Sequence, residues 1–470
     1  MGTHRSYLQI LSDYASLSCE SLRKEISEAL KKESIKLVVL DDDPTGIQTV
    51  HDCLLLTNWR PENLLKAFND ESPIFYVLTN TRSMTAEVAE SVTLEAATAI
   101  VECNRKQGFK LIFISRSDST LRGHFPLEPD TIRQVLESDQ LPVLASTFFI
   151  PAFFEAGRYT IEGTHYLKDK DQLIPVSETE FAADNVFGYH HSDLKAYITE
   201  KAKGQVEATE IGSLSLEELR RNSLPELVSS LKKQSGKPWI IVDALGYDDL
   251  WKFSAALLSI LAETDTNAVM RTSSSLPKAL SGMSDKPLLN RSDLISKGGV
   301  GLFIVGSHVK KSSSQLSVLL ESKQTKGIEL DVNRILQEPD ALIISTIQEL
   351  KAVKKAKLTP VIYTSRKELR SNDATERLLN GSKISDFLVR IVQELPFQPA
   401  YLVAKGGITA HDILTKGLGI ETATVAGQIL PGVPALKTAS DHRFPNMPYL
   451  IFPGNVGEVD ALKHVLEMLA

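Results

Sequence analysis

IKLVVLDDDPTGIQTV, residues 35–50, is an apolar run that ends in three carboxylates and a turn. Residues 35–40 are mostly aliphatic or β-branched, with little alternation between apolar and polar positions. Such a run is typical of a strand covered on both faces within a parallel sheet. Pro44 and Gly46 favour a tight turn, and Thr45 adds a hydroxyl beside it. The stretch therefore predicts a buried strand that delivers polar groups to one edge of a sheet.

The three aspartates that follow this run, Asp41, Asp42 and Asp43, indicate a binding or catalytic site. Carboxylates are rarely buried without partners. Three of them at the end of a buried strand therefore suggest a site for a metal ion, a polyol hydroxyl or a base. A solvated acidic loop is the alternative interpretation.

Further apolar runs in the first half of the chain also end in polar groups. They are PIFYVLTNTRS at residues 73–83, KLIFISRSDSTLRGHF at 110–125 and KPWIIVDALGYDD at 237–249. Helical patterns separate several of these runs, and that alternation predicts an open parallel α/β sheet. Ligands of such sheets bind beyond the carboxyl ends of the strands, so we expect these polar tips to meet in one crevice.

Glycines occupy strand-to-helix junctions in the second half. The junctions lie in VGLFIVGSHVKKSSSQLSVLLES (300–322), PAYLVAKGGITAHDIL (399–414) and PYLIFPGNVGEVDALKHVLEML (448–469). Glycine lets a phosphate approach the backbone closely, and the start of a helix offers free N–H groups and a positive dipole end. Lys405 stands beside one junction, and the set favours a nucleotide site. The Walker, Rossmann and protein-kinase signatures do not occur in the sequence, so the binding mode belongs to another class.

The length and the pattern predict two α/β domains with largely parallel sheets that face each other across a cleft. A chain of 470 residues is too long for one ordinary core. Helical spacing predicts a helical extension over residues 1–34, followed by a first domain over 35–270. Residues 271–299 are rich in Ser, Lys, Pro and Gly and are expected to link it to a second domain over 300–470.

The composition indicates a protein of the cytoplasm that binds neither nucleic acid nor a membrane. A net charge of −7 argues against a nucleic-acid partner held by bulk electrostatics. No apolar run approaches the length of a membrane span, and the N-terminus lacks the apolar region of a signal peptide. The cysteines, Cys19, Cys53 and Cys103, fit reduced thiols. A homodimer is expected only because it is the commonest assembly of soluble enzymes.

After residue 35 the chain resembles the four-carbon acid sugar kinase family. The resemblance is carried, in order, by DDDPTG, the NTRS run, DSTLRG, PAFFEAGR, GSHVKKSSSQ, KGGIT, PGVP and PGNVG. It implies an N-terminal acid-sugar-binding domain and a C-terminal nucleotide-binding domain. The implied activity is ATP-dependent phosphorylation of a tetronate-type acid such as threonate, erythronate or 3-oxo-tetronate. Asp41 stands where members commonly have alanine and Phe154 where they have proline, so a related sugar acid of other length or branching is an alternative.

This resemblance gives roles to residues at the strand ends. Asp42 and Asp118 are candidates for the base that orients or deprotonates the attacking hydroxyl. The candidates for binding the sugar acid are Asp43, Thr45, Arg82, Ser119, Arg122, Gly123 and Arg158. The arginines of this set are expected to clamp the substrate carboxylate, but Arg122 is equally placed to pair with Asp118. The candidates for holding ATP, largely through backbone N–H groups, are Ser307, Gly406, Gly407, Ile408, Thr409, Gly454 and Asn455. Mg²⁺ is expected to accompany ATP, and its ligands are unknown.

Other functions compete with the kinase interpretation. A noncatalytic sensor of sugar acids would keep the same two-domain cleft without phosphoryl transfer. A nucleotide-dependent ligase or an oxidoreductase would act on the same substrates, although the missing dinucleotide fingerprint counts against the oxidoreductase. The aromatic residues Phe148, Phe149, Phe153 and Phe154 are interpreted as core packing rather than as a ligand-binding box.

Overall fold

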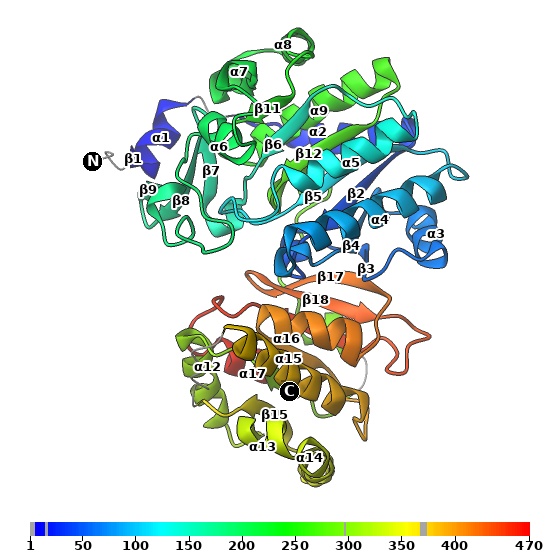
Figure 1. Cartoon of the computed structure of the whole chain (residues 1–470), viewed down its shortest axis with the longest axis vertical. Helices are drawn as coiled ribbons and strands as arrows, with labels where there is room; N and C mark the ends of the chain where they lie inside the picture. The colour runs from blue at the N-terminus through cyan, green and yellow to red at the C-terminus, as the bar shows by residue number, and fades with distance from the viewer. Residues whose placement is uncertain (1–4, 15–16, 296–297, 367–373) are drawn as a thin grey trace. The chain divides into compact units, whose positions relative to one another are not determined.

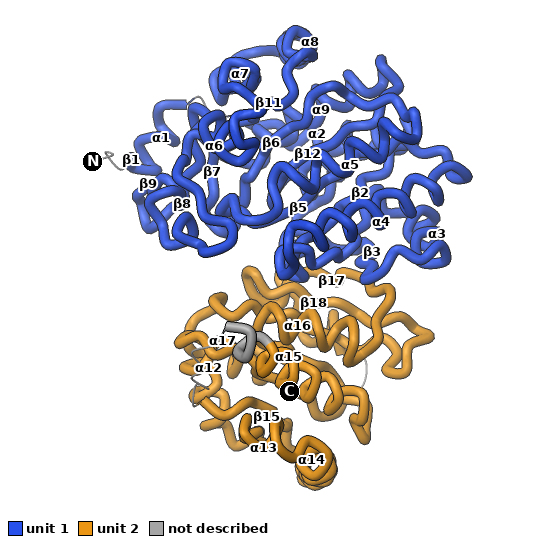
Figure 2. The backbone as a smooth tube through the Cα atoms, in the orientation of Figure 1, with its two compact units in different colours: residues 1–285 blue, residues 286–470 orange. Residues whose placement is uncertain are grey.

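The structure is a computed structural model that describes residues 5–14, 17–295, 298–366 and 374–470. The chain divides into two compact units, Met1–Asp285 and Lys286–Ala470 (Figure 2). Each unit contains helices and a largely parallel sheet, which confirms the prediction of two α/β domains. The cleft between the domains stays a prediction.

The first unit is built on a parallel sheet (Figure 1). In sheet order its strands are β10 (Gly212–Leu214), β11 (Trp239–Val242), β6 (Thr147–Ile150), β12 (Ala268–Thr272), β5 (Lys110–Arg116), β2 (Ile35–Asp41), β4 (Ile74–Leu78) and β3 (Cys53–Leu56). Neighbours in this order pair in parallel. Strand β2 lies between β5 and β4 and is buried along its whole length, as its unalternating apolar sequence predicts.

Helices cover both faces of this sheet (Figure 1). One face is covered by α3 (Pro61–Asn69), α4 (Ala86–Asn104) and α5 (Leu127–Ser138). Phe68, Ile100 and Ile132 from these helices join Val38 and Phe113 from the strands in one buried cluster. Elsewhere in the unit, α9 (Tyr247–Thr264) packs against α2 (Glu20–Lys32), α8 (Leu224–Lys233) and α10 (Ser275–Leu280).

A small antiparallel sheet accompanies the large one in the first unit. Its strands, in order, are β1 (Arg5–Ser6), β9 (Gln172–Pro175), β8 (Thr164–Asp169) and β7 (Arg158–Ile161). The remaining helices of the unit are α1 (Tyr7–Asp13), α6 (Leu194–Lys201) and α7 (Leu216–Arg221). Helix α7 begins where the hydroxyl of Ser215 and the carboxylate of Glu218 satisfy each other's backbone N–H groups. Helices α1 and α2 lie within the segment for which the sequence predicts helices.

Part of the segment expected to be a linker belongs to the first unit. Residues 271–285 fall inside its boundary, and Arg271 and Thr272 complete β12 near the middle of the sheet. Ser273, Ser274 and Ser275 after the strand are completely buried. Small hydroxyl side chains fit beside buried backbone because they can hydrogen-bond locally. A polar composition therefore does not mark this stretch as a connection.

The second unit has a mixed sheet, in which five neighbouring strands pair in parallel and one strand pairs antiparallel with its two neighbours. In sheet order its strands are β17 (Thr422–Leu430), β18 (Val433–Thr438), β19 (Pro448–Phe452), β16 (Leu402–Lys405), β13 (Leu302–Val305), β15 (Thr359–Thr364) and β14 (Thr325–Leu330). Strand β18 pairs antiparallel with β17 and β19, whereas the pairs from β19 to β14 are parallel. Its described helices are α11 (Arg291–Leu294), α12 (Lys310–Leu320), α13 (Val332–Gln337), α14 (Pro339–Lys355), α15 (Ala374–Gln393), α16 (Gly407–Asp412) and α17 (Ala461–Leu469).

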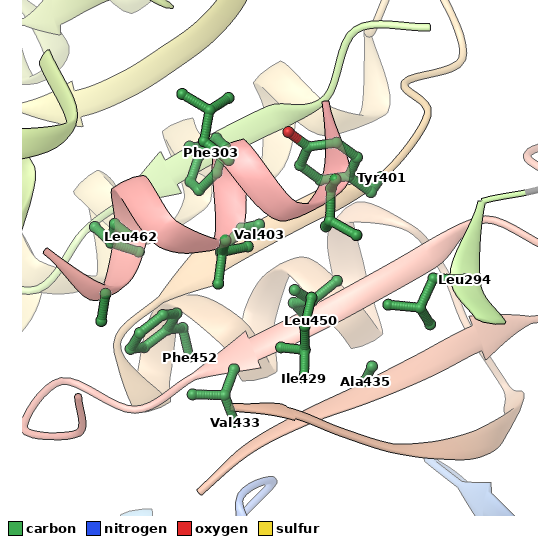
Figure 3. Close-up of a cluster of buried hydrophobic side chains, with 14 of the residues drawn as sticks. Leu294, Phe303, Tyr401, Val403, Ile429, Val433, Ala435, Leu450, Phe452 and Leu462 are labelled. Carbon is green, nitrogen blue, oxygen red and sulfur yellow. The ribbon is translucent and has the colours of Figure 1, made fainter. Parts of the chain in front are cut away.

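One hydrophobic cluster binds this sheet to α12 and α17. Phe303, Val403 and Leu450 from neighbouring strands share one buried cluster with Phe452 and with Leu462 of α17 (Figure 3). These side chains are almost inaccessible to solvent, and burial of such apolar area is the main force that holds the layers together. The sheet edge at the carboxyl ends of β13, β16 and β19 is thereby fixed in place.

The structure also bears on the sequence expectations for four phenylalanines, the three cysteines and membrane spans. Phe148 and Phe149 of β6 and nearby Phe153 are buried, as core packing predicts, whereas Phe154 is only partly buried. Cys19, Cys53 and Cys103 are free thiols. Within the described residues, no helix combines the length and the apolar composition that crossing a bilayer requires.

Candidate active site

The carboxyl edge of the first unit's sheet carries a network of aspartates and arginines. Asp41 ends β2 and Arg116 ends β5, and the two residues are register partners in adjacent parallel strands. The Nη1 atom of Arg116 lies 3.1 Å from Asp41 Oδ1 and 3.4 Å from Asp42 Oδ1. All three side chains are buried, so one guanidinium offsets two carboxylates away from solvent. Asp42 also accepts a hydrogen bond of 2.5 Å from the hydroxyl of Ser117.

Arg82 joins this network from the turn after β4. The turn reverses at Asn80, which adopts the left-handed conformation with φ 55°. Arg82 forms an ion pair with Asp43, and its Nη1 atom lies 3.9 Å from both Asp42 and Asp118. Burial alone would raise the pKa of Asp43, but Arg82, Arg116 and the hydrogen bonds from Thr45 outweigh that effect and lower it.

Asp118 and Arg122 lie in the loop that follows β5. Arg122 Nε is 2.7 Å from Asp118 Oδ2, and its Nη1 atom is 3.5 Å from Asp184. Burial acts to raise the pKa of Asp118, yet Arg82, Arg122 and the Thr120 hydroxyl hold that pKa far below its usual value. In the structure Arg122 therefore pairs with Asp118. The lowered pKa keeps Asp118 ionised at neutral pH.

The other predicted substrate residues surround the same loop. The carbonyl of Ser119 accepts a hydrogen bond of 2.8 Å from Nε2 of His165, whose pKa burial lowers to about 4, so the imidazole is neutral. Gly123 has φ 128°, and a Cβ there would overlap the Ser117 hydroxyl. Arg158, at the start of β7, donates to the carbonyl of Ala156, and its buried Nε atom has no hydrogen-bond partner among the described residues.

Gly46 is required by the close approach of Asp41, and its replacement gives a direct test of the packing. A Cβ at position 46 would overlap the Asp41 carboxylate. Gly46→Ala is therefore expected to lower the free energy of unfolding by about 1–3 kcal/mol, the usual cost of overpacking. Urea unfolding followed by fluorescence measures it. Gly236→Ala is the control because nothing lies within 4 Å of its Cβ position. Equal effects at both positions would contradict the packing argument.

The Asp41 carboxyl predicts a pH dependence of stability. Burial, opposed by Arg116, raises its pKa from 3.8 to about 7. Between these values the folded chain keeps a proton that the unfolded chain has released, so this group's contribution to stability falls as the pH rises. The slope is at most about 1.4 kcal/mol per pH unit. Asp41→Asn removes the titration, and the difference in unfolding free energy between it and the natural chain is expected to change from pH 5 to 7. A constant difference would contradict the assignment.

Sequence reasoning did not select several residues of this network. Arg116 is the cation that pairs with Asp41 and Asp42, and its sequence signal is a cation at the carboxyl end of a mostly apolar strand. Ser274 Oγ lies 3.2 Å from Arg116 Nη2, in the stretch that resembles a linker. Glu128 accepts from Thr81 and Ser115, and burial raises its pKa to about 7.

In the second unit the glycine junctions converge around Ser307. A Cβ on Gly406 would lie 3.0 Å from Ser307 Cβ, and one on Gly454 would lie 3.0 Å from its hydroxyl oxygen. Gly406 has φ 116°, so a side chain there would be strained as well as crowded. The Ser312 hydroxyl lies 2.9 Å from both Ser307 Oγ and the Gly454 carbonyl oxygen. The turns after β13, β16 and β19 therefore form one cluster, the Ser307 cradle.

The remaining predicted nucleotide residues lie at or beside this cradle. Gly407 begins α16, and the side chain of Ile408 is 72% exposed. Thr409 is buried and fills the space where a Cβ on Gly306 would lie. Asn455 is exposed in the turn after β19. Lys405, which favoured phosphate binding in the sequence, instead turns its ammonium inward to the carbonyl of Pro453 at 2.6 Å.

Comparisons with known proteins add to this geometry. A domain family described as a sugar-binding N-terminal domain matches residues 37–280, and one described as a nucleotide-binding C-terminal domain matches residues 302–462. A D-erythronate kinase of Heliobacterium modesticaldum is 27% identical over 221 residues, which are 46% of this chain and 46% of that protein. The match thus spans about half of that curated relative.

Two crystal structures are similar over nearly the whole chain. A Haemophilus influenzae protein gives a TM-score of 0.64 at 18% identity and covers 92% of this chain and 100% of its own. A Salmonella typhimurium LT2 protein gives a TM-score of 0.69 at 17% identity, with 93% and 100% covered. At these identities the likeness concerns the fold alone.

Proposed function

The chain belongs to the four-carbon acid sugar kinase family, and from this we propose that it transfers the γ-phosphoryl group of ATP to a hydroxyl of a small sugar acid. The observation that carries the proposal is one chain with both a sugar-binding and a nucleotide-binding domain. The charged network of the first unit suits a polyhydroxy carboxylate. The Ser307 cradle suits phosphate groups.

We assign the recognition of sugar hydroxyls to Asp118 and Asp43, because charged carboxylates accept strong hydrogen bonds. The side chain of Asp118 is 15% exposed, whereas that of Asp42 is 1% exposed and already engaged by Arg116 and Ser117. Asp118 is therefore the better candidate for orienting the attacking hydroxyl. Asp42 holds Arg82 and Arg116 in place.

Arg158 is our candidate for the substrate carboxylate. Arg82 and Arg122 already pair with aspartates, whereas the described partner of Arg158 is a backbone carbonyl. Arg158→Met is expected to raise KM for the sugar acid at least about tenfold, with a smaller change in kcat, because a charge-assisted hydrogen bond to substrate is lost. Steady-state kinetics measure it.

Arg133→Met is the control for that substitution. Arg133 is also a partly buried arginine that donates to a carbonyl, at 2.8 Å from Leu144, but it lies on α5 outside the network. The KM of the Arg133→Met variant for the sugar acid is expected to match that of the natural chain. An unchanged KM in Arg158→Met would remove Arg158 from carboxylate binding.

ATP would lie in the Ser307 cradle, held by backbone N–H groups of Gly407 and Gly454, with Ile408 against the base. The N–H of Gly406 instead donates to the carbonyl of Phe452 at 2.9 Å, so Gly406 would serve by its close approach to Ser307. Among the described residues, no three His, Cys, Asp or Glu side chains form a group that could hold a metal ion. This fits Mg²⁺, which is usually bound by phosphate oxygens and water with one or two carboxylates. When bound, the ion would neutralise charge on the phosphates during transfer.

A screen for ADP release tests the proposal. The full chain is incubated with Mg-ATP and aldonates of four to six carbons, together with their oxo derivatives, and ADP is measured by a coupled assay. We expect release that depends on one of these acids. Binding of an acid without release would favour the noncatalytic sensor, and AMP as product would favour a ligase. A homodimer and a cytoplasmic location stay predictions.

A further inference from the structure

Arg366, just after β15, is a partly buried cation beside the Ser307 cradle. Its Nη1 atom donates to the carbonyl of Ser307 at 2.5 Å, and Nη2 donates to that of Val305 at 3.4 Å. Its Nε atom is buried, with no hydrogen-bond partner among the described residues. Glu329 on β14 acts on it only through space, and burial lowers its pKa. Among the described residues, this partly buried guanidinium therefore has carbonyl partners and no ion-paired carboxylate.

Lys405 is a second cation with carbonyl partners near Ser307. Its ammonium is completely buried and donates to the carbonyls of Pro453 at 2.6 Å and Val456 at 3.4 Å. The nitrogen also lies 4.1 Å from the centre of the Phe452 ring. Ser307 connects the two cations, because its N–H donates to the Lys405 carbonyl while its own carbonyl accepts from Arg366.

A third cation with carbonyl partners, Arg443, differs from Arg366 in the charge of the backbone that it contacts. Arg443 donates to the carbonyls of Val392 and Gln393, in the last turn of α15, and to that of Gly417. The carboxyl end of a helix carries partial negative charge, which offsets a cation. The carbonyls bound by Arg366 lie instead at the end of β13, and the nearby α12 begins with its positive end at Lys310. Within the part of the chain that the structure describes, neither the carboxyl end of a helix nor an ion-paired carboxylate offsets the charge of Arg366.

We infer that Arg366 binds the phosphate groups of the nucleotide, with Lys405 as a positioning residue that holds the turn after β19. The inference rests on the proposed function. It means that the negative charge of the phosphates is neutralised by a side chain that lies outside the glycine motifs. A bound phosphate would supply the counter-charge that the described side chains do not provide. Arg366 would then do the work that a lysine does in a P-loop.

Calorimetric titration of the full chain with ADP tests this inference. Arg366→Gln is expected to weaken ADP binding at least about tenfold. It is also expected to flatten the loss of affinity between about 50 and 500 mM salt, because a direct charge contact is screened. Arg443→Gln, the matched control, should keep the natural affinity and salt dependence. Thermal unfolding confirms that each variant is folded, and Arg366→Met serves if the glutamine variant is not.

The outcomes separate the two proposals. Natural affinity for ADP in the Arg366 variant overturns the inference, as does a weaker affinity with an unchanged salt dependence, which would indicate a structural role. If the natural chain binds no ADP, the proposed function itself fails. Weaker binding in Arg366→Gln together with a flatter salt dependence supports Arg366 as the phosphate contact.

Discussion

Asp118→Asn is expected to turn over the sugar acid about 10²- to 10⁴-fold more slowly, the usual contribution of a general base or orienting carboxylate. An amide keeps the shape of the side chain but cannot hold the charge that Arg82 and Arg122 stabilise. The nucleotide should still bind normally, because the cradle belongs to the other unit. ADP release at saturating substrates gives kcat, and calorimetry gives the nucleotide affinity.

Asp184→Asn is the matched control. Asp184 also faces Arg122, at 3.5 Å, but in the described part of the chain Arg82 pairs with Asp42, Asp43 and Asp118 and not with Asp184. If the two variants lose kcat equally, the effect passes through Arg122 and not through Asp118. Full activity in Asp118→Asn would remove Asp118 from the chemistry.

The sequence predicted the strand ends well because burial leaves a simple signal. Strands covered on both faces need unbroken apolar runs, so β2, β4 and β5 stand out, and polar residues after them must lie at the sheet edge. The convergence of Asp42, Arg82 and Asp118 follows from that geometry. In the second unit, Gly406 and Gly454 follow β16 and β19, which pair in parallel, so these two turns lie at the same edge of the sheet.

The sequence holds no comparable signal for the direction in which a charged side chain points. Lys405 stands next to a glycine turn in the sequence, yet its ammonium turns inward to backbone carbonyls. Arg366 is far from each glycine junction along the chain and reaches Ser307 only because β15 pairs with β13. Long flexible stems can point either way, and the choice depends on partners that only the folded chain supplies.

The largest effect on stability is expected at Arg116. Arg116→Met removes the cation that lies nearest to both Asp41 and Asp42. Asp41, whose pKa burial already raises to about 7, can then take up a proton, but the buried carboxylate of Asp42 loses its nearest counter-charge. Leaving buried charge unpaired typically costs about 3–5 kcal/mol in the free energy of unfolding. Chemical denaturation of the first unit's transition measures this loss at pH 7.

Two companion variants show whether the unpaired charge is the cause. Arg105→Met breaks an ion pair with Asp139 whose arginine is 59% exposed, so stability should hardly change. Adding Asp42→Asn to Arg116→Met removes the carboxylate that has lost its nearest cation and should restore part of the lost stability, since a neutral amide costs less to bury than an ion. A double variant no more stable than Arg116→Met would mean that the guanidinium acts by packing, and that the aspartates of the sheet edge do not depend on its charge.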